Sequence, residues 1–398
     1  MNSFMPTTNS SPSLRSSTAS YDVIVVGARA AGAATAMLLA RAGLRTLLID
    51  RSPFGADTLS THALMRGGVA QLTQWGLIDE IVAAGTPAVK RTTFTYGEEQ
   101  IVISIKPKHG VDALYAPRRT VLDTILVRAA IDAGVEFHDR TTVTDLITRS
   151  GRVVGVQVST NDTRSVSVQA PLVVGADGIR STVARRVDSP FTRLGDNATA
   201  TTYGYWTDLD TDGYEWVFRP NGCCGVIPTN DGQACVFAGA TPQRIGAGGL
   251  DVLLDIVSES APELAERLGR AVPPTGTRSW PGRRGYIRHS FGPGWTLVGD
   301  AGYFKDPIGA HGLTDALRDA DLIARAIIAG HGDTSTLTAE LGQYQSIRDQ
   351  LSTPLFDVVD KIASQQWDAS EIADLLLRLN SAMAAEIEAL VSLDGYGR

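Results

Sequence analysis

The sequence predicts an α/β protein in which a doubly wound domain is interrupted by a β-sheet domain and followed by a helical tail. Three observations support this prediction. Short apolar runs at 22–26 and 46–49 flank an Ala- and Leu-rich segment, which makes a β–α–β unit of about thirty residues. Stretches at 92–105 and 201–237 alternate with a period of two and predict antiparallel strands. From residue 314 onward the apolar spacing is mostly helical.

The doubly wound part opens with a strand at 22–26, a helix at 30–41 and a strand at 46–49. This order is typical of a Rossmann-like domain, which binds ligands at the carboxyl ends of its parallel strands. Segments 92–96 and 101–105, joined by a polar turn, predict a hairpin. Further helices are predicted at 67–72, 77–84 and 121–133. Further strands are predicted at 135–138, 142–148, 153–159, 165–174 and 296–298.

The second β-rich block spans about 201–237 and contains turns at Pro220-Asn221-Gly222 and Asn230-Asp231-Gly232. Two helices follow it, near 252–257 and 262–268. Because strand-rich segments interrupt the doubly wound pattern twice, we expect discontinuous domains. The expected boundaries are a leader at 1–20, the doubly wound domain at 21–90, 107–186 and 281–352, the β-sheet domain at 91–106 and 187–280, and C-terminal helices at 353–398.

The composition is that of a globular protein, with 43% hydrophobic and 20% charged residues, so we expect a sizeable core. A net charge of −7 argues against nucleic acid or an anionic membrane as a partner. Residues 1–20 are rich in Ser, Thr and Pro and predict a disordered leader, not a signal peptide. Cys223, Cys224 and Cys235 do not have the spacing of disulfide or zinc sites; we expect buried side chains and a cytoplasmic protein.

The first chemical motif is Gly27-Ala28-Arg29-Ala30-Ala31-Gly32, which follows the first strand and opens the first helix. Free N–H groups at a helix N-terminus suit a pyrophosphate, while Gly27 allows a tight turn and Gly32 close packing. Arg29 replaces the usual middle glycine, and it either adds positive charge or points to solvent. Asp50 ends the second strand, where an acid takes the ribose hydroxyls of an adenine dinucleotide. This motif alone does not distinguish FAD from NAD.

Two further motifs follow apolar strands. Asp177-Gly178 comes after 173–176 and precedes a helix, although an isolated Asp-Gly is only a turn. Gly299-Asp300 comes after the strand at 296–298, and a carboxylate at a strand end can hold polyol hydroxyls. Gly312 then opens a long helix, whose N-terminus favours negative charge.

These three motifs, in this order, resemble the FAD-dependent monooxygenases of the para-hydroxybenzoate hydroxylase type. The wider superfamily also includes flavin halogenases and geranylgeranyl reductases. Arg119-Thr120-Val121-Leu122-Asp123 is similar to another element of the family, and the resemblance covers about residues 21–350. Arg29 departs from the family pattern and weakens only the argument for close approach at that position.

The resemblance implies a Rossmann-like FAD-binding domain and a β-sheet substrate domain that covers the flavin. The cofactor-binding residues that it implies are Gly27, Ala31, Gly32, Asp50, Arg51, Arg119, Asp177, Gly299, Asp300, Gly312 and Leu313. Beside the isoalloxazine ring it implies a catalytic loop with Pro307, Gly309, His311, Gly312 and Leu313. Asp50 would hold the adenosine ribose, and Asp300 the ribityl or pyrophosphate region.

The activity that the resemblance implies is a monooxygenase that uses FAD and NAD(P)H and acts through a flavin C4a-hydroperoxide. Its substrate would be an electron-rich small molecule, aromatic or polyketide-like. NAD(P)H would visit transiently, since no second glycine-rich β–α–β unit is visible. Three alternatives stay open: an FAD-dependent reductase or dehydrogenase of a hydrophobic substrate, a flavin halogenase, and a non-catalytic FAD-binding partner protein.

The remaining candidates each have a structural alternative. Tyr203, Tyr205, Trp216 and Phe218 alternate on predicted strands, so they share one face as a substrate pocket or as core. His62 and His311 either touch flavin or substrate or make structural hydrogen bonds. Lys305 is either close to the flavin or in a surface ion pair. Lys90 invites the halogenase interpretation, but we expect a solvated side chain because Arg91 adjoins it. The C-terminal helices either pack on the protein or mediate a homodimer.

Overall fold

The computed structural model describes residues 21–160 and 165–394; the predicted leader lies outside these ranges. A six-stranded sheet forms the centre of the larger domain, in the order β17-β18-β9-β1-β2-β5. All neighbouring pairs are parallel except that of the edge strand β17 with β18. The strands are β1 (Val23–Val26), β2 (Thr46–Ile49), β5 (Glu136–His138), β9 (Leu172–Gly175), β17 (Phe291–Gly292) and β18 (Trp295–Leu297).

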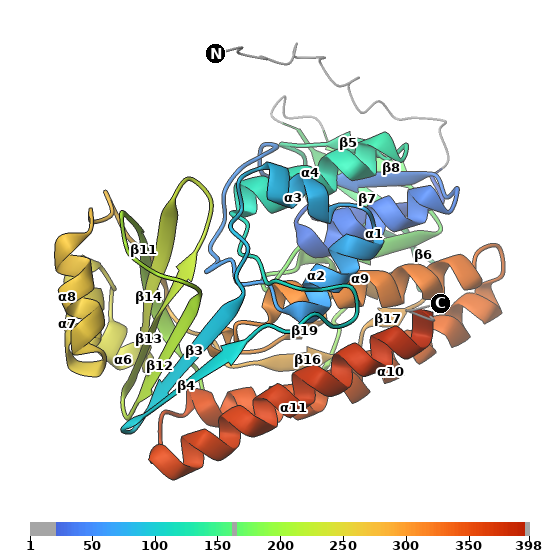
Figure 1. Cartoon of the computed structure of the whole chain (residues 1–398). Coiled ribbons are helices and arrows are strands. Elements are labelled where there is room, and N and C mark those ends of the chain that lie inside the picture. The colour runs from blue at the N-terminus through green and yellow to red at the C-terminus, as the bar shows by residue number, and fades with distance from the viewer. Residues whose placement is uncertain (1–20, 161–164, 395–398) are drawn as a thin grey trace, which may run out of the picture.

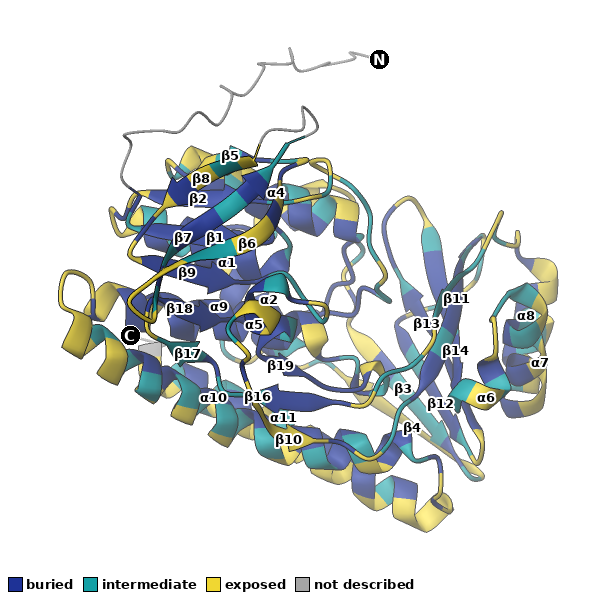
Figure 2. Ribbon diagram, turned by 180° about the vertical axis from the view of Figure 1, so that it is seen from behind, coloured by how far each residue is buried: buried dark blue, intermediate teal, exposed yellow. Residues whose placement is uncertain are grey.

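Both faces of this sheet are buried, because β1 alternates its side chains between two layers. Val23 and Val25 pack with α1, α4 and α9, whereas Ile24 and Val26 pack with the antiparallel sheet β6-β7-β8. Figure 2 shows β1 and β9 in the dark blue of buried residues. Continuous apolar runs are typical of such strands. The two layers consist of α1 (Ala30–Arg41), α4 (Arg119–Asp132), α9 (Gly312–Ala329), β6 (Thr142–Arg149), β7 (Arg152–Ser159) and β8 (Ser165–Gln169).

A second sheet of seven strands, in the order β15-β11-β14-β13-β12-β3-β4, forms the smaller domain. Its outer face is covered by α6, α7 and α8, and the hairpin β3–β4 joins it through the parallel pair β3–β12 (Figure 1). The strands are β3 (Arg91–Tyr96), β4 (Glu99–Ser104), β11 (Ala200–Thr207), β12 (Tyr214–Arg219), β13 (Gly222–Pro228), β14 (Gln233–Ala240) and β15 (Arg278–Trp280). The helices are α6 (Pro242–Ile245), α7 (Leu250–Ser260) and α8 (Pro262–Arg270).

Two long helices at the C-terminal end, α10 (Thr334–Ala363) and α11 (Ala369–Asp394), run along both domains (Figure 1). α10 packs on α9, and α11 packs on α10, α2 and β3. No helix among the described residues is long and apolar enough to span a bilayer. The remaining elements are α2 (Arg66–Gln74), α3 (Ile78–Ala83), α5 (Thr182–Arg186), and a small sheet of β10 (Phe191–Leu194), β16 (Tyr286–Arg288) and β19 (Tyr303–Phe304).

The predicted α/β class, the discontinuous β-sheet domain and the helical tail are confirmed. One predicted strand, at 165–174, is wrong, because the chain forms two strands in different sheets. β8 ends at Gln169 and belongs to the antiparallel sheet, whereas β9 begins at Leu172 and enters the parallel sheet. Pro171 lies between them; its missing N–H and fixed φ suit a break in pairing.

Candidate functional site

The glycine-rich turn joins the end of β1 to the N-terminus of α1 and is held by close backbone packing. Gly27 has a φ of +105°, and a Cβ there would lie 2.4 Å from the carbonyl oxygen of Ala176. A Cβ at Gly32 would lie 1.8 Å from the carbonyl oxygen of Gly27. The fold itself therefore requires both glycines. No described side chain caps α1, so its first amides are available to a phosphate.

Asp50 follows β2 and lines the pocket beside the glycine-rich turn. Its carboxylate accepts one hydrogen bond from the amide of Ala28 at 2.7 Å and one from the amide of Ser52 at 2.7 Å. Each carboxylate oxygen can accept a second bond, so capacity remains for ribose hydroxyls. The pocket beside Asp50 is lined by Ala28, Arg29, Asp50, Ser52, Pro53, Phe54, Gly55, Asp123, Val127 and Phe137. Arg51, which we also predicted to bind cofactor, is exposed next to this pocket.

The side chain of Arg29 does not point to solvent, and its charge is paired. Its guanidinium donates to Asp123 at 3.0 Å and to the carbonyl of Ala56. Asp123 also accepts hydrogen bonds from Arg119 at 3.0 Å, one turn earlier on α4. Two arginines thus share one buried carboxylate, and these three side chains together carry a net positive charge. This charge offsets the negative charge of Asp50, which lines the same pocket.

Asp177, in the second motif, stabilises its own turn. Its carboxylate accepts hydrogen bonds from the hydroxyl of Ser181 at 2.5 Å and from the amides of Thr182 at 2.6 Å and Val183 at 3.3 Å. Burial raises the pKa of Asp177, and these hydrogen bonds oppose that effect. Asp177 therefore holds the start of α5; its contact with the cofactor stays a prediction.

The third motif lies directly against the first. Gly299 has a φ of +58° in a short 3-10 helix, η1 (Gly299–Ala301), and a Cβ there would lie 2.8 Å from the Cβ of Ala31. Asp300 follows at the C-terminal end of β18. Burial raises the pKa of Asp300 to about 6, and the positive charges of Lys305 and Arg119 oppose this rise. The fold therefore brings together two motifs that are far apart in the sequence.

The predicted catalytic loop runs through a second 3-10 helix, η2 (Pro307–Gly309), into α9. Gly309 is packed against α10, since a Cβ there would lie 2.6 Å from Cγ2 of Val359. Gly312, the first residue of α9, is exposed, and a Cβ there would meet nothing within 4 Å. No described side chain caps α9. An uncapped helix N-terminus facing open space suits a group with anionic character, so this loop fits a flavin. Leu313, next along, is buried in the core of the larger domain.

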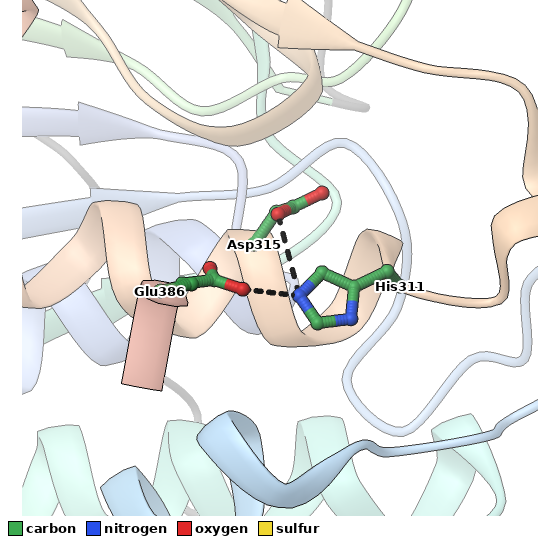
Figure 3. Close-up of side chains that lie close together, drawn as sticks. All are labelled: His311, Asp315 and Glu386. Atoms are coloured by element: carbon green, nitrogen blue, oxygen red, sulfur yellow. Dashed lines mark hydrogen bonds and ion pairs between the residues drawn. The ribbon is translucent and has the colours of Figure 1, made fainter. Parts of the chain in front are cut away.

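Behind this loop lies a buried cluster of charged groups that we call the loop cluster: Lys305, His311, Asp315, Arg318, Asp319 and Glu386. His311 Nε2 lies 2.5 Å from a carboxylate oxygen of Glu386 and 3.8 Å from one of Asp315 (Figure 3). Burial lowers the pKa of His311, although Glu386 opposes this. Lys305 is 5% exposed and forms an ion pair with Asp315, so of the two alternatives left open for it the surface ion pair is wrong.

The loop cluster contains three groups that could ligate a metal ion, His311, Asp315 and Glu386. The carboxylate oxygens of Asp315 and Glu386 already lie beside cationic side chains. The guanidinium of Arg318 lies 2.7 Å from Glu386 and 3.1 Å from Asp315, and Lys305 pairs with Asp315. Arg318 pairs with all three carboxylates of the cluster and Lys305 with one of them, so the cluster is an ion-pair network with two cations for three carboxylates. Sequence reasoning missed Arg318 and Glu386, because nothing local marks their burial.

The four aromatic candidates share the inner face of the seven-stranded sheet, as predicted. All four pack in the core between this sheet, the larger domain and α11. Trp216 and Phe218 lie deep in that core; the Trp216 indole donates to Thr92, and Phe218 meets the ring of Trp367 edge to face. Tyr203 and Tyr205 instead meet polar groups of the larger domain. The hydroxyl of Tyr203 accepts a hydrogen bond from the amide of Ser60 at 3.1 Å.

His62 lies at the junction of the two domains, in a conformation that is rare for histidine. It has a φ of +70°, is 1% exposed, and its Nε2 lies 2.7 Å from the hydroxyl of Tyr205. Its Nδ1 is buried and has no hydrogen-bond partner among the described residues. Burial and nearby arginines lower the pKa of His62 well below its ordinary value, so the ring is neutral near pH 7. Backbone strain of this kind is typical of functional sites.

Two further predictions concern isolated residues. Lys90 is a surface side chain, 67% exposed, 3.6 Å from Asp112, so the expected solvated side chain is confirmed. The three cysteines are buried and free, as expected.

Comparisons with known proteins agree with this geometry. A family model described as FAD binding domain matches residues 20–358. Digeranylgeranylglycerophospholipid reductase 1 of Methanococcoides burtonii is 28% identical over 322 residues, which cover 78% of this chain and 74% of that protein. Squalene monooxygenase SE1 of Panax ginseng is 25% identical over 368 residues, covering 84% of this chain and 64% of that protein.

Among solved structures, the flavin-dependent brominase Bmp2 superposes with a TM-score of 0.75 at 19% identity, over 94% of this chain and 99% of that one. At this identity the similarity concerns the fold alone. The match of the family model covers most of the chain and contains all three motifs. The chain therefore belongs to the FAD binding domain family and is an FAD-dependent oxidoreductase.

Proposed function

We propose that the protein is a monooxygenase of the para-hydroxybenzoate hydroxylase type, which uses FAD and NAD(P)H to transfer one oxygen atom to an electron-rich aromatic or polyketide-like molecule. When bound, the flavin supplies the reductive activation of dioxygen. The protein then has to bind the cofactor, orient the substrate and exclude water. In this proposal the cofactor extends from the pocket beside Asp50 to the loop before α9.

The observation that supports this proposal is a set of three polar side chains, His62, Tyr205 and Arg118, at the aromatic inner face of the seven-stranded sheet. We call this set the polar group. His62 and Tyr205 are hydrogen-bonded at 2.7 Å, and the guanidinium of Arg118 lies 3.3 Å from the centroid of the Tyr205 ring. The segment that carries His62 is tied to α9, since the amide of Met65 donates to Thr314 at 3.1 Å. This contact supports a position of the polar group near the proposed flavin loop. Aromatic rings can stack on such a face, while the imidazole and phenol can bind a substrate hydroxyl or carbonyl.

A reductase of a hydrophobic substrate is the second candidate, because the reductase of Methanococcoides burtonii aligns over most of the chain. A purely apolar chain would leave His62 Nδ1, which has no hydrogen-bond partner among the described residues, unpaired at the contact. Burying such a group unpaired costs about 1–3 kcal/mol. The polar face therefore favours an oxygen-bearing substrate. Lys90 lies at the surface, which argues against it as the halogen-carrying lysine of a halogenase.

The test is turnover of the FAD-loaded protein with NADPH or NADH and a panel of simple phenols under labelled dioxygen. We expect substrate-stimulated NAD(P)H oxidation and one labelled oxygen atom in the product. Reduction of a prenyl double bond without oxygen consumption would overturn the proposal in favour of the reductase. NAD(P)H oxidation that no substrate stimulates and that yields no product would contradict both.

Variants then test the polar group. Tyr205→Phe removes the hydroxyl that His62 contacts, so the substrate is held less well and more reduced oxygen escapes as hydrogen peroxide. We expect product per NAD(P)H to fall about tenfold, a loss of about 1.4 kcal/mol in orientation, at unchanged FAD occupancy. Tyr96→Phe is the matched control, because Tyr96 lies on the same inner face but lacks the bond to His62. An equal ratio of product to oxidised NAD(P)H in both variants would show that Tyr205 does not orient the substrate.

A further inference from the structure

The C-terminal helix α11 reaches the proposed flavin loop with one buried side chain. α11 spans Ala369–Asp394 and lies beyond residues 20–358, which the family model matches. Glu386 on this helix is 2% exposed, and its two carboxylate oxygens have different partners. One lies 2.5 Å from His311 Nε2 (Figure 3), and the other lies 2.7 Å from Arg318. The helix therefore contributes a charge to the loop cluster behind the predicted catalytic loop.

Glu386 is held as a carboxylate. Burial alone would raise its pKa, but His311, Arg318 and Lys305 outweigh burial and lower the pKa of Glu386 to about 2. Arg318, which is fully buried, also pairs with Asp319 at 2.6 Å. Charges buried in this way are tolerated only when they are paired and hydrogen-bonded. Removal of one charge therefore changes the hydrogen bonds and ion pairs of the other groups in the loop cluster.

The ionised carboxylate decides the state of His311. A carboxylate can only accept hydrogen bonds, so His311 must present a proton on Nε2. Since burial lowers the pKa of this histidine, the ring stays neutral and Nδ1 carries no proton. Glu386 thus fixes both the tautomer and the orientation of the imidazole, as a carboxylate partner does for histidines at metal sites.

The backbone hydrogen bonds around His311 are local: the amide of Ala310 donates to Pro307, and the carbonyl of His311 accepts from the amide of Asp315. Ala310, immediately before it, has a φ of +47°, which is unfavourable for a residue with a Cβ. Gly312, immediately after it, is exposed and faces open space. The bond from Glu386 to His311 is a polar contact that joins this short segment to α11. A loop in a strained conformation persists only where surrounding contacts hold it.

We propose that Glu386 is a positioning residue that fixes His311 and the segment 310–312 against the flavin, which makes α11 part of the active site. This inference rests on the proposed placement of the flavin beside the loop before α9. In that arrangement Glu386 does not touch the flavin. It acts through the position of His311 and through its negative charge in the loop cluster.

The test compares Glu386→Gln with Glu388→Gln, its matched control on the same helix. Glutamine keeps an oxygen that can accept from His311 but removes the charge, whereas Glu388 is exposed and pairs with Lys108 and His109. We expect Glu386→Gln to weaken FAD binding about three- to thirtyfold, which lies within the range of coupling between contacting residues. Glu388→Gln should bind FAD as the wild type does.

The flavin midpoint potential, measured at matched FAD occupancy, is the readout that a purely structural role would leave unchanged. Reduced flavin carries negative charge, so loss of the Glu386 charge should stabilise it and raise the potential. A tenfold change in the reduction equilibrium corresponds to about 30 mV for a two-electron couple. We expect a rise of about this size in Glu386→Gln and none in Glu388→Gln.

His311→Gln supplies a second arm, for the case that Glu386→Gln fails to fold. If Glu386 acts through His311, His311→Gln alone should weaken FAD binding as strongly as Glu386→Gln does. The double variant should then bind FAD no more weakly than either single variant. Additive losses, or a change in thermal stability with unchanged affinity and potential, would overturn the inference. These readouts need no turnover, so they can fail while the monooxygenase proposal stands, and the reverse also holds.

Discussion

Asp50 is predicted to organise the adenosine end of the cofactor site in two ways at once. Its carboxylate already accepts the amides of Ala28 and Ser52, both at 2.7 Å, and so fixes the backbone around the glycine-rich turn. The remaining acceptor capacity is available to the ribose. One residue thus links the shape of the turn to the recognition of the sugar.

From this arrangement we predict that Asp50→Ala weakens FAD binding by about tenfold to a hundredfold, since a hydrogen bond to a charged group contributes about 1.5–3 kcal/mol. The measurement is the dissociation constant of FAD from fluorescence titration of the apoprotein. Asp132→Ala, at the exposed end of α4, is the control and should bind FAD as the wild type does. Equal affinities for the two variants would rule out the ribose role of Asp50.

At this scale, the sequence predicted residues whose chemistry is marked by their neighbours. Gly27, Asp50 and Asp300 each follow an apolar strand, and parallel strands place their carboxyl ends at one edge. Glu386 could not be predicted in this way, because its partner His311 lies 75 residues earlier and an acidic residue on a helix is usually exposed. For the same reason the sequence left open whether Lys305 lies near the flavin or at the surface.

At the scale of elements, the structure assigns different roles to two glycines of one loop. Gly309 is packed against Val359 of α10, so its small size serves the packing of the protein. Gly312 begins α9 and faces open space, so nothing in the chain requires its small size. A glycine with room around it is explained by a ligand that approaches the backbone closely.

We therefore predict opposite effects for two matched substitutions. Gly309→Val overpacks the contact with α10 and should lower the free energy of unfolding of the apoprotein by about 1–3 kcal/mol. Gly312→Val should leave that free energy near the wild-type value but displace the flavin from the helix N-terminus. Loss of about 1.4 kcal/mol of stabilisation of the reduced flavin would lower its midpoint potential by about 30 mV.

Urea denaturation of the apoproteins and redox titration of the FAD-loaded proteins separate these two effects. Each variant serves as the control for the other, because the substitution is the same and the positions are three residues apart. An unchanged potential in folded, FAD-loaded Gly312→Val would refute the placement of the flavin at this loop.

Most elements were predictable because their periodicity is local. The hairpin β3–β4 was predicted from alternation, and its membership of the smaller domain from its place in the sequence. Its parallel pairing with β12 was not predicted, because a partner about 120 residues later leaves no local signal. The break between β8 and β9 was missed because only Ala170 and Pro171 separate the alternating strand β8 from the apolar strand β9.

At the scale of the whole molecule, one buried side chain joins the two domains. Asn230, in the turn after β13, is 2% exposed. Its carbonyl oxygen accepts from the amide of Arg118 at 2.9 Å, and its amide nitrogen donates to the carbonyl of Ala84 and to Thr86, both at 2.9 Å. Arg118 is also the residue whose guanidinium lies over Tyr205. The contact between the domains and the proposed substrate group therefore share a residue.

We predict that Asn230→Ala lowers the free energy of unfolding by about 2–4 kcal/mol, because it removes three hydrogen bonds, one of them to the buried hydroxyl of Thr86. Urea denaturation, followed by tryptophan fluorescence and circular dichroism, measures this loss. Gln243→Ala, an exposed position on α6, is the control and should change the free energy by less than about 0.5 kcal/mol. If Asn230 joins the domains, the variant should also couple NAD(P)H oxidation to product less well, since Arg118 and Tyr205 lose their register with the larger domain. If Asn230→Ala is as stable as Gln243→Ala, other contacts hold the domains together. If Asn230→Ala loses stability but forms as much product per NAD(P)H as the wild type, the contact between the domains does not orient the substrate.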